Sequence, residues 1–141
     1  MIIKEELQKY NLYFAKISKV EMEIHALEND MINLKSPTID GLPRATGFSQ
    51  STLEGKIVKN LERIADKKFK IQEIKDKIDL INKLIKTLKD YQQQVIRARY
   101  IDNIDINYIA EKEHKEYRTI QANIDSAINE MQKNYDKIEN T

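Results

Sequence analysis

Four side chains in one short stretch, Lys115, Tyr117, Arg118 and Gln121, are of types that recognise nucleic acid. An arginine can hold a guanine through O6 and N7, a glutamine can pair with an adenine edge, and a lysine can neutralise a phosphate. We therefore predict DNA contacts here, with Arg118 and Gln121 facing bases and Lys115 facing a phosphate. A solvated charge remains an alternative for Arg118, and a place at the edge of the core remains one for Tyr117.

These side chains open a segment, from about Tyr117 to Tyr135, that has the apolar spacing of a helix. Spacing of this kind lines one side of a helix, so Tyr117, Arg118 and Gln121 should lie on the side opposite a core. Glu116 and Asp125 belong to the same segment and would limit its affinity for phosphates. The expected core residues are Ile120, Ile124, Ala127, Ile128 and Met131.

Two shorter helices should precede it, one over 91–101 and one that starts at Ile106 with Asp105 as its N-cap. A short helix, a tight turn and a longer helix form the outline of a helix-turn-helix, with the small Ala110 where the two helices cross. The turn, residues 113–116, reads Glu-His-Lys-Glu, whereas the usual turn has an apolar residue, a glycine, an apolar residue and a small hydroxyl residue. Histidine is among the residues enriched at positive φ, so the geometry can survive without glycine.

The helix-breaking residues are confined to one region: all three glycines and both prolines lie within 37–55. We therefore expect a loop over 36–52, longer than a plain connector. Ser51 or Thr52 should cap the helix that follows, over 53–89.

Apolar residues on both sides of this loop recur with the alternation of 3 and 4 that makes two helices supercoil. Tyr10, Tyr13 and Phe14 precede the first series at looser spacing. The prediction is an all-α fold, with a long antiparallel helical hairpin over 1–90 and a three-helix head over 91–141. Dimerisation would bury the sides of the two long helices that their pairing leaves uncovered. The two seams are Ile17, Val20, Ile24, Leu27, Met31 and Leu34, then Ile57, Leu61, Ile64, Lys68, Ile71, Ile74, Ile78, Ile81, Ile85 and Leu88.

The charge is balanced overall and uneven locally. The chain carries 24 basic and 23 acidic side chains, a net charge of +1, which by itself predicts no polyanionic partner. Residues 56–90 hold eleven Lys or Arg against six Asp or Glu, a balance of +5, while 1–55 hold six against eight, a balance of −2. This basic helix could meet nucleic acid, but we favour its pairing with the acidic first helix.

Enzyme chemistry finds little support in the residue types. His25 and His114 are isolated, there is no cysteine, and three glycines could hardly form a phosphate-binding loop. We therefore expect no catalytic residue, no metal and no cofactor. No apolar run approaches the ~18–20 residues of a membrane-spanning helix, and the first residues lack the pattern of a signal peptide, so a cytoplasmic location is expected.

A motif in the loop gives the most specific signal: Ser36-Pro37, Asp40-Gly41 and Pro43-Arg44. With the run Arg97 to Ile101 and the later Ile109-Ala110, Thr119-Ile120, Ala127 and Met131, the chain resembles the ArpU/RinA type of phage late-gene transcription regulators. The resemblance implies a DNA-binding activator of late phage genes in a Gram-positive bacterial host, with a helix-turn-helix similar to region 4 of sigma factors. Its partners would be promoter DNA and RNA polymerase.

Other interpretations stay open. The chain could be a coiled-coil module that binds another protein, or a small terminase-like packaging subunit. The loop motif could fold back over the end of the hairpin, or Arg44 could present a charge to a partner.

Overall fold

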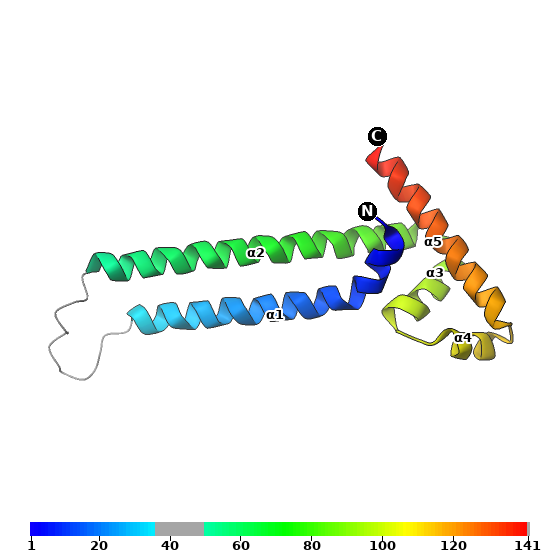
Figure 1. Ribbon diagram of the computed structural model, residues 1–141, viewed down its shortest axis with the longest axis horizontal. Coiled ribbons are helices and arrows are strands. Elements are labelled where there is room, and N and C mark those ends of the chain that lie inside the picture. Colours follow the sequence, from blue (N-terminus) through cyan, green and yellow to red (C-terminus); the bar gives the residue numbers. More distant parts are fainter. Residues whose placement is uncertain (36–49, 141) are drawn as a thin grey trace. The chain divides into compact units, whose positions relative to one another are not determined.

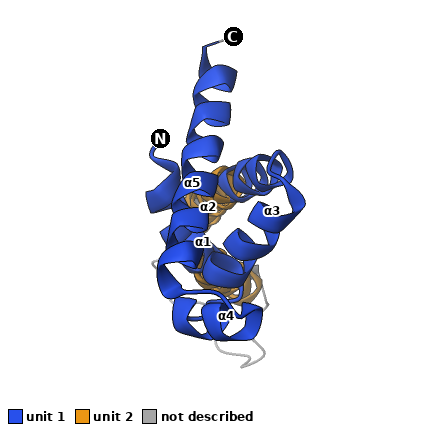
Figure 2. Ribbon diagram, turned by 90° about the vertical axis from the view of Figure 1, so that its right-hand side faces the viewer, with its two compact units in different colours: residues 1–14, 75–141 blue, residues 15–74 orange. Residues whose placement is uncertain are grey.

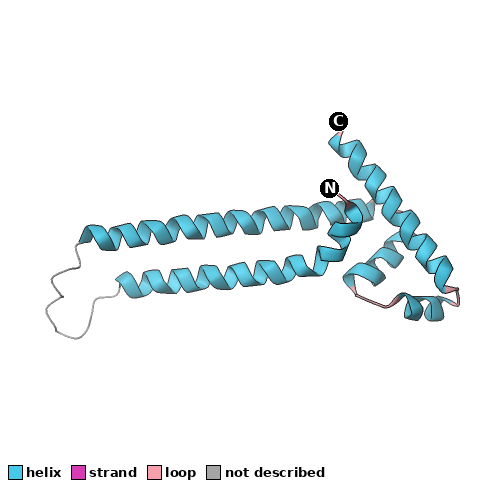
Figure 3. Cartoon of the chain, viewed as in Figure 1, coloured by secondary structure: helices cyan, strands magenta, loops and turns pink. Residues whose placement is uncertain are grey.

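The computed structural model describes residues 1–35 and 50–140, which form helices joined by short turns (Figure 3). No strand occurs among these residues, so the predicted all-α class is confirmed. The loop motif, Ser36 to Arg44, lies outside the described residues. The α-helices, labelled in Figure 1, are α1 (Ile3–Lys35), α2 (Gln50–Lys86), α3 (Asp90–Ile96), α4 (Ile106–Glu113) and α5 (Tyr117–Glu139), and the π-helical turn η1 (Arg97–Ile101) follows α3.

The ends of α2 differ from the prediction. The helix begins at Gln50, so Ser51 and Thr52 lie inside it and not at its cap. It ends at Lys86 instead of Lys89, because the hydroxyl of Thr87 donates to the carbonyl oxygen of Leu84 at 2.6 Å. The backbone N–H of Thr87 donates to the same carbonyl oxygen at 3.1 Å, which tightens the last turn into the i to i+3 pattern common at helix ends.

The chain forms two compact units, coloured separately in Figure 2. Unit 1 comprises Met1–Phe14 and Lys75–Thr141, and unit 2 comprises Ala15–Ile74. The boundary predicted near residue 90 lies within unit 1, in the turn between α2 and α3. No helix in the described part of the chain is long and apolar enough to cross a membrane.

Unit 2 has an apolar core built from both long helices. Val20 and Ile24 of α1 pack with Ile64 and Ile71 of α2, and Ile17, Leu27 and Met31 pack against this cluster. All seven occupy predicted seam positions. Leu61, also predicted in the seam, is 50% exposed. When only two helices pair, each buries a narrow stripe of its surface. The predicted seam of α2 included positions, such as Leu61, that lie outside this stripe.

One ion pair joins the two helices of unit 2. The ammonium of Lys67 donates to a carboxylate oxygen of Glu23 at 2.7 Å. This hydrogen bond lowers the pKa of Glu23, and the positive charges of Lys67, Lys19 and Lys70 act in the same direction. At this position the basic side of α2 does meet an acid of α1, as we expected.

Unit 1 has a larger core, in which α3 and α4 each pack against α5. Among its fully buried side chains are Ile3 and Leu7 of α1, Ile81, Leu84 and Ile85 of α2, Val95 and Ile96 of α3, and Ile120, Ile124 and Met131 of α5. The core of this unit therefore takes side chains from both ends of the chain. No residue pattern predicted that residues 1–14 would pack here.

Polar contacts fix the first turns of α1 within unit 1. The backbone N–H of Ile3 donates to Oε1 of Gln132 at 2.9 Å, and Nε2 of Gln132 donates to the carbonyl oxygen of Met1 at 3.1 Å. The first N–H groups of a helix have no partner within it, so a side chain of α5 satisfies one of them here. Further along α1, Nδ2 of Asn11 donates to the carbonyl oxygen of Tyr100, at the end of η1, at 3.0 Å.

Unit 1 also contains a buried polar pair, Glu6 and Tyr13 of α1. Glu6 is 9% exposed and accepts a hydrogen bond from the hydroxyl of Tyr13, which is 4% exposed. Burial raises the pKa of Tyr13, and the carboxylate of Glu6 raises it further. The ammonium of Lys77 lies 5.7 Å from the centre of the Tyr13 ring, so a cation of α2 faces the pair.

Candidate nucleic-acid interface

The segment from α4 through α5 has the outline of a helix-turn-helix, and its inner side is buried as predicted. In α4, which packs against α5, Ile109 and Ala110 are 5% and 6% exposed. Along α5 the expected core residues Ile120, Ile124, Ala127, Ile128 and Met131 are all buried. Asp105 occupies the N-cap position of α4, but its side chain makes no capping hydrogen bond.

The turn between α4 and α5 closes without glycine. His114 follows α4 with φ 56° and ψ 42°, the left-handed conformation that glycine usually supplies at this place. The next residue, Lys115, donates its backbone N–H to the carbonyl oxygen of Ala110 at 2.9 Å, which satisfies a carbonyl of the last turn of α4. The expectation that histidine can take the positive φ is therefore confirmed.

The polar side chains of the turn have a common partner, Tyr91 of α3. Its hydroxyl donates to Oε2 of Glu113 at 2.9 Å. It also accepts hydrogen bonds from Nζ of Lys115 and from Nδ2 of Asn123, both at 3.2 Å. The ammonium of Lys115 stands 4.2 Å from the ring centre, within the range of a cation–π contact. One tyrosine thus links α3, the end of α4, the turn and α5.

These contacts explain why the turn lacks the usual apolar residues. A turn that is held by an apolar core needs apolar side chains, whereas this one is held by hydrogen bonds at the edge of unit 1. Glu113, Tyr91 and Asn123 are half-buried, and Lys115 is exposed. Sequence reasoning missed Tyr91 and Asn123, because a tyrosine before a run of glutamines and an asparagine within a helix carry no local pattern.

Two of the four predicted contact residues are open to solvent. Tyr117, the first residue of α5, is 48% exposed, and Arg118 is exposed beside it. Arg118 precedes the fully buried Ile120 by two residues, which on a helix places the two side chains on different sides. Within the described residues, no hydrogen bond or ion pair holds the guanidinium of Arg118.

The other two predicted residues are already engaged within the chain. Lys115 is held by Tyr91, as described above, although it stays exposed. Nε2 of Gln121 donates to Oδ1 of Asp125 at 3.0 Å, one helical turn further along α5. Gln121 would therefore have to exchange Asp125 for a base edge in order to read DNA.

The charge of this surface is balanced. Lys115 and Arg118 supply two positive charges, and the exposed Glu116 and Asp125 supply two negative ones. Such a surface attracts a phosphate backbone weakly, because non-specific affinity grows with the number of phosphates that cations neutralise. Recognition here would depend on a few directed contacts.

An exposed tyrosine that sequence reasoning did not select lies on α4. Tyr108 is 56% exposed, on the helix that precedes the turn and α5. Ile106 and Ile109 are both buried and three residues apart, which places them on one side of α4. This spacing could have indicated that Tyr108, between them, points outward. Its aromatic ring and hydroxyl add a further exposed polar group to this end of unit 1.

The histidines do not form a metal site in the described residues. His25 is an exposed side chain whose Nδ1 lies 3.7 Å from Oε2 of Glu28, and His114 is in the turn between α4 and α5. In residues 1–35 and 50–140 no three side chains of the histidine, cysteine, aspartate or glutamate type come together as a metal ion would need.

No protein-family model, curated protein or solved structure matches the chain.

Proposed function

We propose that this chain is a DNA-binding transcription regulator, which inserts the first turns of α5 into the major groove. The observation that carries the proposal is the position of Arg118. It is an exposed guanidinium at the start of a 23-residue helix whose opposite side is buried against α3 and α4. A recognition helix of a helix-turn-helix contacts bases with its N-terminal residues, so the exposed turn is the one that this mode of binding uses.

Each predicted residue has a chemical role in this proposal. Arg118 donates to O6 and N7 of a guanine, and Gln121 leaves Asp125 to pair with an adenine edge. Lys115 reaches a phosphate from the turn, and Tyr117 contributes a hydroxyl beside it. Because Lys115 is held over the ring of Tyr91, it is placed before DNA arrives and loses less side-chain freedom on binding.

A single head of this kind would bind weakly, so the proposal includes a homodimer joined through unit 2. Two heads on two half-sites gain affinity through the high effective concentration of the second head. The exposed apolar side chains of unit 2 support an interface there, since a second copy of the chain would remove them from water. They are Met22, Ile32, Val58, Leu61 and Phe69.

The resemblance to the ArpU/RinA regulators supports the cellular part of the proposal. The chain would act in the cytoplasm of a bacterial host, at the promoters of late phage or prophage genes, with RNA polymerase as a further partner. It would carry no catalytic activity and no cofactor.

A binding experiment tests the proposal directly. Duplexes would be selected from a random pool with the full chain, and the affinity of the enriched duplex measured by fluorescence anisotropy at several salt concentrations. Arg118→Ala should weaken binding of the enriched duplex by roughly 1–3 kcal/mol. Lys137→Ala is the matched control, because Lys137 is an exposed cation of the same helix, about 28 Å away at ~1.5 Å per residue.

Two results would contradict the proposal. One is a pool that yields no enriched sequence, and the other is an affinity that Arg118→Ala and Lys137→Ala change equally. An affinity that does not fall with rising salt would also exclude contacts through phosphates.

The exposed apolar residues of unit 2 equally favour a second function, a coiled-coil module that binds another protein. That function predicts an interaction which tolerates Arg118→Ala and is lost on Phe69→Glu. The regulator also uses unit 2 for its dimer, but its binding to DNA should weaken in Arg118→Ala, so Arg118→Ala is the variant that separates the two functions.

A further inference from the structure

The exposed apolar side chains of α2 form a second stripe on that helix. Val58, Leu61 and Phe69 are 51%, 50% and 66% exposed, and Ala65 between them is also exposed. The four residues follow one another at intervals of 3, 4 and 4, which at about 100° per residue places them all within an arc of about 80°. All of them belong to unit 2.

This stripe is distinct from the side of α2 that packs against α1. Ile64 and Ile71, which α2 contributes to the core of unit 2, are centred roughly 115° away from it around the helix. Because α1 occupies that other side, it leaves the stripe open to solvent, as the exposed fractions show. A helix with two apolar sides is suited to two partners, since each side gains free energy when it leaves water.

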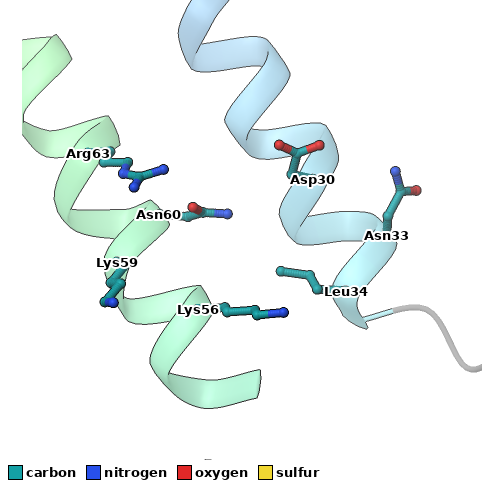
Figure 4. A pocket seen from close by; sticks show the side chains of 7 residues that line it. All are labelled: Asp30, Asn33, Leu34, Lys56, Lys59, Asn60 and Arg63. Carbon is teal, nitrogen blue, oxygen red and sulfur yellow. The ribbon is translucent and has the colours of Figure 1, made fainter. Parts of the chain in front are cut away.

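A third side of α2 is charged and lies near the end of α1. Figure 4 shows Lys56 and Arg63 projecting from α2 towards α1, where Asp30 lies. Four residues after Arg63, the ammonium of Lys67 donates to a carboxylate oxygen of Glu23. Acidic residues of α1 thus face this side of α2, which is centred roughly 165° from the stripe. The stripe itself contains no charged residue, so its partner should be apolar.

The shape of the stripe is complementary to a copy of itself. Leu61, Ala65 and Phe69 are four residues apart, and rows with this spacing form the ridges that interdigitate when two helices cross at about −50°. The small Ala65 in the middle of the row allows two helix axes to approach closely, while Leu61 and Phe69 fill the space on either side. A two-fold axis at Ala65 therefore lets the same row supply both surfaces of a contact.

We propose that Val58, Leu61, Ala65 and Phe69 form the contact through which α2 of one copy of the chain packs against α2 of a second copy. This inference rests on the homodimer of the proposed regulator and names its contact residues. The stripe spans about 16 Å of α2 at ~1.5 Å per residue. Such a contact is smaller than the interface of a permanent dimer, so we expect monomer and dimer to exchange at micromolar concentrations.

Met22 of α1 does not belong to this contact, although it is 72% exposed. Its neighbours three and four positions away on the helix are small or polar, so no large apolar side chain of α1 lies beside it. They are Ser18, Lys19, His25 and Ala26. Single exposed apolar residues are common on protein surfaces, so Met22 serves as a matched control for Phe69.

Sedimentation equilibrium of the full chain over about 1–200 µM tests the proposal, and we expect a reversible equilibrium of monomer and dimer. Phe69→Glu should weaken the dimer at least about tenfold, because it places a charge in an apolar contact. Met22→Glu makes the same change of charge at a more exposed position and should leave the dissociation constant unchanged. Both side chains are exposed, so the variants should fold, and circular dichroism melting checks that they do.

A disulfide locates the two-fold axis. The chain has no cysteine, so Ala65→Cys introduces a single thiol. Two such residues beside the axis should have their Cβ atoms within the roughly 3.5–4.5 Å that a disulfide needs. Ala65→Cys should therefore oxidise to a covalent dimer at least about tenfold faster than Met22→Cys, because the dimer holds its thiols at high effective concentration.

Three results would overturn the proposal: a chain that stays monomeric at about 200 µM, equal effects of Phe69→Glu and Met22→Glu on the dissociation constant, or equal rates of disulfide formation at positions 65 and 22. A monomeric chain whose melting temperature falls in Phe69→Glu would assign the stripe to a contact within one copy and also refute it.

The failure of this contact and the failure of the proposed function can be told apart. A monomeric chain that binds a duplex in an Arg118-dependent way would keep the regulator and refute the contact between copies. A dimer that Phe69→Glu dissociates, but that binds no duplex, would keep the contact and refute the regulator.

Discussion

The ammonium of Lys115 lies 4.2 Å from the ring centre of Tyr91 and 3.2 Å from its hydroxyl oxygen. The residue that we expect to contact a phosphate is thus fixed by a residue of another helix. The same hydroxyl serves Glu113 and Asn123, so the turn and α5 depend on one side chain of α3. This dependence can be tested without DNA.

Tyr91→Phe keeps the ring and removes the hydroxyl with its three hydrogen bonds. Because the site is half-buried and water can replace some of these bonds, the free energy of unfolding should fall by about 1–2 kcal/mol. Urea denaturation measures the loss. Tyr108→Phe removes the hydroxyl of an exposed tyrosine on α4 and should leave the unfolding midpoint unchanged, so equal midpoints for the two variants would contradict the role of Tyr91.

His114→Gly should stabilise the protein. The left-handed conformation at φ 56° strains any residue with a Cβ, and glycine relieves that strain for a gain of roughly 0.5–1 kcal/mol. His114→Val should destabilise, because a β-branched residue fits this conformation worst. Thermal melting reports both signs. Lys112→Gly, in the exposed part of α4, should lower Tm, and a similar fall for His114→Gly would show that the turn is not strained.

Leu7→Ala should destabilise a helix that lies more than 100 residues away in the sequence. Leu7 is 1% exposed in unit 1, so its truncation should cost about 2–5 kcal/mol. The loss should appear as faster amide hydrogen exchange in α5, because both belong to one core. Leu12→Ala is the control, since Leu12 is 59% exposed. If Leu7→Ala leaves the rate of amide exchange in α5 unchanged, residues 1–14 are not part of that core.

The ion pair of unit 2 should make stability depend on pH on the acidic side. Lys67 lowers the pKa of Glu23 below its ordinary value of 4.5, so the pair contributes stability above that value and loses it as the pH falls through the lowered pKa. The stability difference between the parent and Glu23→Gln should therefore be present at pH 7 and vanish in strong acid. Lys67→Gln should give the same profile, and the double variant should be no less stable than either single one. A difference that persists in acid would contradict the pairing.

Much of the helical organisation follows from residue spacing. The seam positions Ile24, Ile64 and Ile71 are buried, as are Ile120 and Ile124 on the inner side of α5, because a period near 3.6 places them on one side of a helix. The left-handed turn at His114 also agreed with a known preference of histidine. Spacing was less reliable in two respects. Leu61, expected in the apolar seam, is exposed, and α2, expected to begin at Leu53, begins at Gln50.

Spacing shows which side of a helix is apolar and not what covers that side. Ile3, Leu7 and Tyr10 recur at helical intervals, yet nothing in them indicates α5 as a neighbour. Tyr91 poses a similar difficulty, since its partners in α4, in the turn and in α5 are all distant from it in the sequence. The candidate contact residues could be found from their types, but the engagement of Lys115 and Gln121 depends on neighbours that only the folded chain brings together.

The hydrogen bond between Ile3 and Gln132 spans 129 positions, and it sets an order of events during synthesis. A ribosome releases the apolar residues of the first turns long before α5 exists, whereas both halves of unit 2 are complete by residue 74. Closing so long a segment is slow compared with forming local contacts. Unit 2 can therefore fold on the nascent chain before α5 is synthesised. Until α5 emerges from the ribosome, the apolar side chains of Ile3 and Leu7 remain exposed and can be bound by chaperones.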